Sequence, residues 1–232
     1  MKAKLISYSQ TPGNFPILVD EEAGEVGEIQ ALIAFCARVS NPDNQMNMQT
    51  ADKLIKYLVR NKHWSPLEMV SACLEIETTR DIARQLLRHR SFSFQEFSQR
   101  YAVSQEFVIR ECRIQDPKNR QNSIALDENN DEHRRIMWQW EAMQKKALEQ
   151  AQAAYTWALE NGIAKEQARA VLPEGLTMSR LYVNGTLRSW VHYIELRSAN
   201  GTQKEHMELA RECAVVIAKV FPMINDFCYG DA

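Results

Sequence analysis

Glycine is scarce in this sequence and never closely spaced. Only eight of the 232 residues are glycine, and no two of them are separated by a single residue. A Gly-x-Gly-x-x-Gly turn therefore cannot occur, and neither can a Walker loop. Any phosphate bound here must be held by side chains or by helix N-termini, because no glycine-rich backbone cradle is present.

Paired cysteines, long apolar runs and a strong charge of either sign are also absent. The five cysteines are scattered and never form Cys-x-x-Cys, so neither a disulfide framework nor a zinc site is indicated, and we expect buried small apolar residues. No window approaches 18 apolar residues, and the N-terminus lacks the apolar stretch of a signal peptide. The 28 basic and 30 acidic residues give a net charge of −2, which argues against a DNA-coating protein. We expect a cytoplasmic protein with no membrane and no nucleic-acid partner.

The composition is that of a folded chain. Hydrophobic residues make up 45% of the sequence and charged residues 25%, which excludes disorder by composition. The length suits one large domain or two small ones, and either can bury a full core.

Apolar periodicity in the first half of the chain predicts both helix and strand. The spacing of apolar residues favours a helix over 51–60 after a cap at Thr50, and strict alternation favours a half-buried strand over 69–77. Thr78 and Asp81 have the spacing of a capping box, which would open another helix.

The middle of the chain is more polar. We expect a polar loop over 91–100 and then a strand over Val103–Ile109. Residues 110–134 are rich in charge and in Asn and Asp, and we interpret them as an exposed excursion within one domain rather than a linker.

Helices are expected to dominate the last hundred residues, with a strand at Leu181–Val183. The expected helices are a long one over 135–160 stopped at Asn161 and Gly162, a shorter one up to Leu172 and Pro173, one over 187–197 capped by Thr186, and a last one opened by a capping box of Thr202 and Glu205 and ending near Pro222. The mixture indicates an α+β fold in a single domain over 1–232.

The densest polar cluster is RHRSFSFQEFSQRY, from Arg88 to Tyr101. It interleaves three arginines and a histidine with four aromatic residues. Because the guanidinium group can hydrogen-bond to phosphate bidentately and stack on planar rings, the cluster indicates an anionic, aromatic ligand such as a nucleotide. An arginine-rich structural network and a nucleic-acid patch are the alternatives.

This cluster resembles the signature of the flavin-dependent thymidylate synthases, the ThyX family. Arg88-His89-Arg90 is followed after seven residues by Ser98, and Gln95 stands where the family usually has Asn. Other positions that match the family pattern are Ser93, Glu96, Arg100 and Tyr101.

Further blocks resemble the same family in the same order along the chain. They are Cys36-Ala37-Arg38-Val39-Ser40, His63-Trp64-Ser65-Pro66-Leu67-Glu68, Arg169 to Pro173, Arg188-Ser189-Trp190 through His192 to Leu196-Arg197, and Gln203-Lys204-Glu205. Ordinary thymidylate synthases use a cysteine nucleophile that follows a proline, and no cysteine here follows a proline.

The resemblance implies an activity and an assembly. The implied reaction is reductive methylation of dUMP to dTMP, with methylenetetrahydrofolate as carbon donor and FAD, reduced by NADPH, as hydride source. The implied fold has a small, mostly antiparallel sheet flanked by helices. The implied assembly is a homotetramer with shared active sites.

The resemblance also assigns site residues. The dUMP site would comprise Gln85, Leu86, Leu87, Arg88, Glu96, Phe97, Ser98, Gln99, Arg100, Arg169 and Arg197. The FAD site would comprise His63, Ser65, Arg88, His89, Arg90, Glu96, Thr186, Leu187, Arg188 and His192. Arg197 would be catalytic by stabilising an ionised uracil ring, and no metal is implied.

Helical spacing agrees with part of this assignment. Gln85 and Arg88 share a helix face at i, i+3, and Arg188 and His192 share one at i, i+4, so each pair can reach one ligand. Arg197 lies roughly half a turn away from Arg188, at ~100° per residue, which suits a second ligand.

Two positions leave alternatives open. Ser98 can bind through its hydroxyl or act as a nucleophile, but His89 is nine residues away and no orienting carboxylate is evident, which favours binding. Thr186 stands where the family has Asn, and Asn184 lies two residues earlier, which a small insertion would explain.

Two other functions compete with the enzyme hypothesis. A single-stranded nucleic-acid module would use the arginines with Phe92, Phe94, Phe97 and Tyr101 as stacking groups, but it normally needs a basic groove, which the acidic net charge does not favour. A family member that only carries flavin or nucleotide is the other alternative, and the intact motif argues against it.

Overall fold

The computed structural model describes residues 1–12, 27–104 and 106–228. Its main sheet is antiparallel, with the strand order β1-β2-β6-β3. The strands are β1 (Lys2–Tyr8), β2 (Ser71–Thr79), β3 (Ser93–Glu96) and β6 (Met178–Thr186). β2 and β6 pair along nine residues without a bulge, from Ser71 opposite Thr186 to Thr79 opposite Met178. This α+β fold confirms the predicted fold class.

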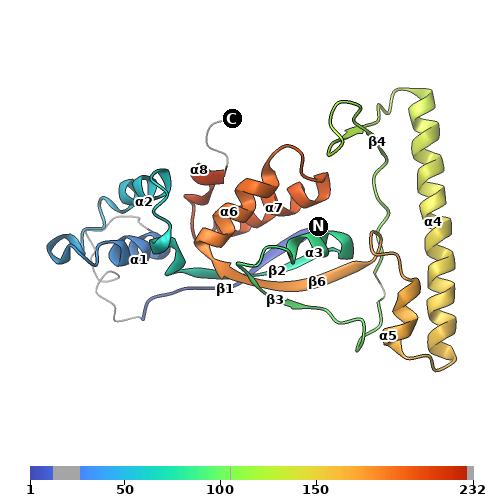
Figure 1. Cartoon of the computed structure of the whole chain (residues 1–232), viewed down its shortest axis with the longest axis horizontal. Coiled ribbons are helices and arrows are strands. Elements are labelled where there is room, and N and C mark those ends of the chain that lie inside the picture. The colour runs from blue at the N-terminus through green and yellow to red at the C-terminus, as the bar shows by residue number, and fades with distance from the viewer. Residues whose placement is uncertain (13–26, 105, 229–232) are drawn as a thin grey trace.

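Helices cover one face of this sheet (Figure 1). Leu74 and Ile76 of β2 point into the core beneath them, whereas Glu75 and Glu77 lie on the opposite face, as the two-residue period of a strand requires. The covering helices are α3 (Arg80–Leu86), α6 (Leu187–Ser198) and α7 (Lys204–Ile217). Their largest fully buried side chains are Trp190 and Tyr193, both on α6.

The two ends of the sheet carry different elements (Figure 1). Toward one end lie α1 (Glu28–Ala37), η3 (Pro42–Asn44), α2 (Ala51–Arg60), η4 (Ser65–Glu68) and α8 (Ile224–Cys228). Toward the other lie the hairpin β4 (Arg113–Gln115) and β5 (Ser123–Ala125), α4 (Asp131–Glu160), α5 (Lys165–Ala168) and η5 (Arg169–Val171). The 30-residue helix α4 stands beside the sheet and buries only Gln144, Tyr155 and Ala158. None of the helices in the described ranges is long and apolar enough to cross a bilayer.

Several sequence expectations are confirmed. The helix over 51–60 has the predicted bounds, although the Thr50 side chain makes no capping bond to it, and the predicted strand over 69–77 is observed as β2. Thr186 caps α6 by accepting a hydrogen bond from the Ser189 N–H at 3.3 Å. α4 ends at Glu160, and Gly162 follows with φ of 75°, a backbone conformation that glycine adopts without strain.

Both predicted capping boxes are wrong. Thr78 still belongs to β2, and the residue before α3 is Thr79, whose hydroxyl bonds to the Asp81 carboxylate at 2.5 Å. At α7 the cap position is Gln203 rather than Thr202, with no side-chain bond to the helix end.

The expectations for 91–134 are partly wrong. The polar loop over 91–100 contains β3, and the strand over 103–109 is reduced, in the described residues, to one isolated bridge between Phe107 and Thr177. The excursion is exposed at its hairpin, but the side chains of Arg110 and Arg113 are only 16% and 12% exposed. The sequence also did not predict β1 and α1.

The cysteine expectation holds in part. Cys213 is buried, whereas Cys36, Cys73 and Cys112 are half-buried free thiols.

Candidate functional site

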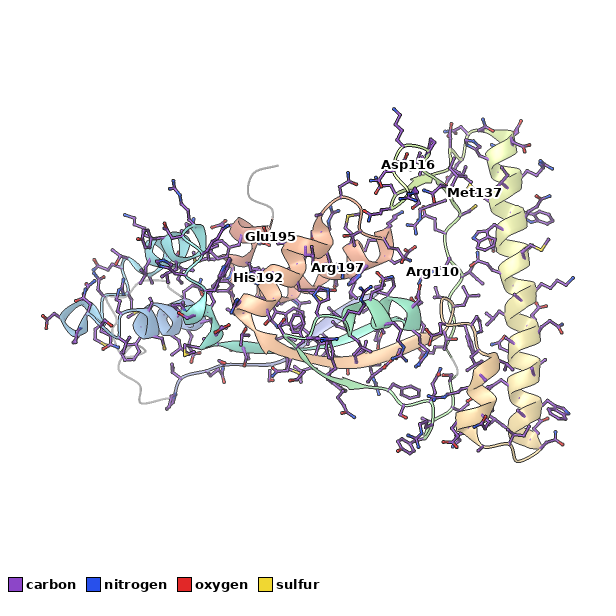
Figure 2. The ribbon with its side chains drawn as sticks, in the orientation of Figure 1. Arg110, Asp116, Met137, His192, Glu195 and Arg197 are labelled. Carbon is purple, nitrogen blue, oxygen red and sulfur yellow. The ribbon has the colours of Figure 1, made fainter. Side chains whose placement is uncertain are left out.

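Two of the sequence blocks that resemble the family meet where the turn after α3 contacts the last turn of α6. Arg197 donates from Nε to His89 Nε2 at 2.9 Å, although 108 residues separate them. The His89 ring also lies edge-on to Tyr193, with the ring centroids 5.0 Å apart. Figure 2 shows Arg197 and His192 at separate places along α6. The fold therefore brings the predicted catalytic arginine to the Arg-His-Arg motif.

The histidines of this region are neutral at physiological pH. Burial, and then the charges of Arg197 and Arg88, lower the pKa of His89 to about 4. Burial, and then Arg197 and His89, lower the pKa of His206 to about 3. Because His89 Nε2 accepts the bond from Arg197, its ring proton resides on Nδ1.

The same region has guanidinium groups available to an anion. Arg88 and Arg90 are exposed, Arg197 is half-buried, and within the part of the chain that the structure describes none of the three forms an ion pair. An unpaired cluster of this kind suits a phosphate or an ionised ring.

A neighbouring group of residues comes from η4 and the start of α6. The rings of Trp64 and His192 meet edge-on, with their centroids 4.4 Å apart, and Arg188 forms an ion pair with Glu68. Ser65 and His63 are exposed beside them. Burial and then Arg188 lower the pKa of His192, against the opposing effect of Glu195.

Some predicted positions can reach a ligand only through the backbone. The side chains of Leu86 and Leu187 are fully buried in the core, and Leu87 packs against it. The Thr186 side chain is engaged in capping α6.

Asn184 is exposed in mid-strand where the β2–β6 pairing is regular, so no bulge marks an insertion there.

Glu96 is held within the chain. Its carboxylate lies 3.5 Å from Arg80 and 3.2 Å from Arg84, and it accepts a hydrogen bond from Ser179 at 3.0 Å. A ligand bound by Glu96 must share the carboxylate with these groups.

The remaining predicted residues form a second group near α5. Arg100 lies 3.5 Å from Glu166, and Arg169 donates to the Glu166 carbonyl at 3.3 Å. Ser98 Oγ accepts a bond from the Arg100 N–H at 3.3 Å and, in the described residues, touches neither a histidine nor a carboxylate. Gln99 is buried and bonded to Ser104, while Phe97 lines a cavity of 260 Å³. No hydrogen bond or ion pair among the described residues joins Ser98, Arg100 or Arg169 to Arg88, His89 or Arg197.

Gln85, a predicted residue, contacts polar groups at the first site that were not predicted. Gln85 donates to Gln203 at 2.8 Å and meets His206 Nδ1 at 3.2 Å. His206 Nε2, Tyr193 Oη and Ser198 Oγ are buried and have no hydrogen-bond partner in the described residues. Among these groups, only Gln203 had a signal in the sequence, the Gln203-x-Glu205 spacing. Nothing in the sequence indicated His206 or Tyr193. No group of His, Cys, Asp and Glu suited to a metal occurs in the residues searched, which are those described above.

Comparisons with known proteins identify the family of this chain. The model of a family described as "Thymidylate synthase complementing protein" matches residues 24–223. A probable flavin-dependent thymidylate synthase of Paramecium bursaria Chlorella virus 1 is 48% identical over 225 residues, covering 97% of each chain. A flavin-dependent thymidylate synthase of Synechocystis is 47% identical, covering 87% of this chain and 90% of that one. The structure of the UMP/dUMP methylase PolB of Streptomyces cacaoi, bound with 5-Br dUMP, matches with a TM-score of 0.77 and 25% identity, covering 97% of this chain and 93% of that one.

Proposed function

This chain belongs to the family of flavin-dependent thymidylate synthases, and on that premise we propose that it methylates dUMP to dTMP. Methylenetetrahydrofolate gives the carbon, NADPH reduces the bound FAD, and tetrahydrofolate leaves as product. The observation that carries the proposal is the meeting of Arg88, His89 and Arg197, where two guanidinium groups with no ion pair to any described residue lie beside a neutral imidazole.

The residues assigned to FAD suit an anionic and aromatic cofactor. Arg88 and Arg90 are exposed and offer charge, and Ser65, Arg188 and His192 lie together at η4 and α6. Tyr193, whose ring lies edge-on to His89, and Ser198, next to Arg197 in the sequence, have buried hydroxyl groups without a partner in the described residues, and these groups can bind a water or a ligand. FAD, when bound, supplies the redox chemistry. The chain contributes binding and orientation, and we propose no metal.

The uracil ring is assigned to Arg197. A cation near N3 and the ring carbonyls stabilises the ionised ring, and this stabilisation is strongest where no carboxylate of the protein competes. His89 leaves that charge undiminished because it is neutral and accepts the Arg197 N–H. Ser98 binds through its hydroxyl, since no base is bonded to it in the described residues.

We propose a homotetramer in which subunits share active sites. Gln85 and Arg88 of one chain would face Ser98 and Arg100 of another, which accounts for two groups of site residues that no described contact joins. Exposed apolar side chains on α4 also support an assembly, since Trp138 is 71% exposed, Met143 64% and Trp157 60%. We further propose that the enzyme works in the cytoplasm.

Purification and a component-omission assay test the function. The purified protein is expected to be yellow, to bleach with NADPH in the absence of oxygen, and to form dTMP only when dUMP, methylenetetrahydrofolate and NADPH are all present. One NADPH should be consumed for each dTMP, because the hydride comes from NADPH and the folate leaves as tetrahydrofolate. A colourless protein that cannot take up FAD, or a yellow one that forms no dTMP, would refute the proposal.

A further inference from the structure

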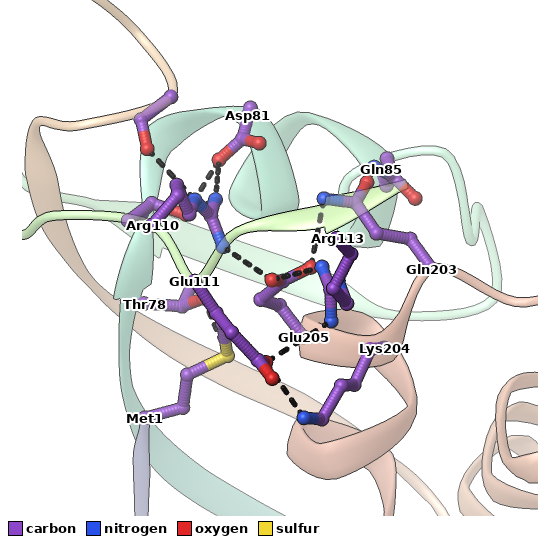
Figure 3. A network of polar contacts seen from close by, with 12 residues as sticks. Met1, Thr78, Asp81, Gln85, Arg110, Glu111, Arg113, Gln203, Lys204 and Glu205 are labelled. Carbon is purple, nitrogen blue, oxygen red and sulfur yellow. Dashed lines mark hydrogen bonds and ion pairs between the residues drawn. The ribbon is translucent and has the colours of Figure 1, made fainter. Parts of the chain in front are cut away.

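A line of polar side chains runs from the excursion 110–134 to the candidate nucleotide site. Arg113 donates to one carboxylate oxygen of Glu205, and Gln203 donates to the other at 3.0 Å. Gln203 in turn accepts a bond from Gln85 Nε2 at 2.8 Å, and Gln85 Oε1 lies 3.2 Å from His206 Nδ1. Figure 3 shows this line up to Gln85. We call Glu205, Gln203, Gln85 and His206 the relay.

The carboxylate end of the relay is firmly held. Arg110 Nη1 lies 3.6 Å from Glu205, and the same guanidinium contacts Asp81 at 2.6 Å and the Gly175 carbonyl at 3.0 Å. Burial acts to raise the pKa of Glu205, but hydrogen bonds from its own backbone and from Gln203, with the charges of Arg113 and Arg110, outweigh burial and lower it. Glu205 is therefore ionised and can only accept hydrogen bonds.

An ionised end group determines the direction of every bond along the relay. Because the Glu205 carboxylate only accepts, Gln203 must turn its NH₂ group toward it and its carbonyl oxygen toward Gln85. Gln85 must then present its NH₂ group to Gln203 and its carbonyl oxygen to His206.

The contact with Gln85 determines which ring nitrogen of His206, at the far end of the relay, carries the proton. Its Nδ1 faces a carbonyl oxygen, so Nδ1 carries the proton and Nε2 is the free acceptor. The ring is fully buried and neutral, so only one of its two nitrogens carries a proton.

We propose that Glu205 is a positioning residue that fixes, through Gln203, which way the Gln85 carboxamide faces and hence which hydrogen-bonding groups it offers to the nucleotide. The proposal rests on the proposed function in one respect, the contact between Gln85 and dUMP. It also gives the excursion a role, because Arg110 and Arg113 hold the carboxylate that sets the direction.

The substitution Glu205→Gln is expected to reverse the relay. Arg113 and Arg110 only donate, so the new amide must turn its oxygen toward them and its NH₂ group toward Gln203. Gln203 and Gln85 then rotate in turn, and His206 must move its proton from Nδ1 to Nε2. The KM for dUMP should rise about tenfold, which corresponds to one mismatched hydrogen bond, with a smaller change in kcat.

Nitrogen-15 NMR of the histidine-labelled holoenzyme without dUMP reads the His206 tautomer directly. We expect the Nδ1–H form in the wild type and the Nε2–H form in Glu205→Gln. Glu208→Gln is the matched control, because Glu208 is exposed on the same helix and the change removes the same charge. This control should keep the wild-type tautomer and the wild-type KM.

A second variant separates the relay from the ion pairs. Gln203→Leu leaves Glu205 paired with Arg113 but removes the hydrogen bonds that link Glu205 to Gln85. This variant should therefore also raise the KM for dUMP and leave FAD content unchanged. This variant also tests the proposal if Glu205→Gln folds poorly. An Nε2–H tautomer in the wild type, or KM values in both variants equal to that of Glu208→Gln, would overturn the proposal. The wild-type omission assay tests the proposed function separately, because the tautomer measurement needs no turnover.

Discussion

Removing Arg197 is expected to impair chemistry far more than cofactor binding. Its one hydrogen bond in the described residues goes to His89, and no carboxylate there neutralises its charge. Of the residues assigned to FAD, His192 packs against Trp64 and Arg188 pairs with Glu68, and neither contact involves Arg197. Arg197→Ala should therefore retain FAD and lose the stabilisation of the ionised uracil ring.

The expected loss can be given a magnitude. Removing one preorganised donor that stabilises developing charge costs on the order of 10²–10³ in rate. A second effect follows at His89, where burial is the largest cause of its lowered pKa and Arg197 the next. Without Arg197, the pKa of His89 should rise from about 4 toward its usual value.

The assay compares kcat at saturating dUMP with the ratio of flavin to protein. Arg211→Ala is the matched control, since Arg211 is exposed on α7 and makes no contact in the described residues with the site. Near-normal turnover of Arg197→Ala with bound FAD would refute the assignment.

Three further predictions follow from the same geometry. Ser98→Ala should weaken dUMP binding about fivefold and leave measurable turnover, since a neutral hydrogen bond is worth roughly 1 kcal/mol; a covalent adduct trapped on Ser98 would contradict this. Inactive Arg88→Ala and Arg100→Ala chains, mixed and reassembled, should recover part of the activity, whereas verified hetero-oligomers that stay inactive would exclude a shared site. The free energy of unfolding should fall as the pH drops from about 6.5 toward 3, because unfolded His206 binds a proton that the folded chain excludes. The substitution His206→Gln should flatten this fall by up to about 1.4 kcal/mol per pH unit, and an unchanged slope would contradict the prediction.

Elements with a strong local period were predictable. The helix over 51–60 buries Ala51, Ile55 and Leu58 on one face, and this spacing, with Thr50 before it, predicts its bounds. The N-cap at Thr186 is equally local, because the serine N–H that it accepts lies three residues ahead.

Pairing between distant segments overrode local signals elsewhere. Thr78 has a good capping side chain, yet it pairs with Ser179 in the sheet, so α3 begins later than the motif suggests. The polar sequence of β3 predicts a loop, but the segment forms a strand because it pairs with the edge of β6 from Asn184 to Leu181. No window of sequence contains the partner that decides either case.

The candidate site shows the same limit. The motif identified Arg88, His89 and Arg197, but their meeting depends on α6 packing back over the sheet. Polarity misled at Arg110 and Arg113, since charged residues are buried where they find partners such as Asp81 and Glu205. A polar segment is solvent-exposed only when the fold offers it no such partner.

The direction of β3 explains why one chain does not bring all its site residues together. From Ser93 to Glu96 this strand runs along β6 from Asn184 to Leu181, away from Thr186, where α6 begins. Four residues of strand carry the chain roughly 13 Å in that direction, at about 3.3 Å per residue. Ser98 and Arg100 thus reach α5, near the start of β6, while Arg188 and His192 lie beyond its end. In the proposed shared site, a second chain supplies the group near α5, and the mixed Arg88→Ala and Arg100→Ala experiment decides whether it does.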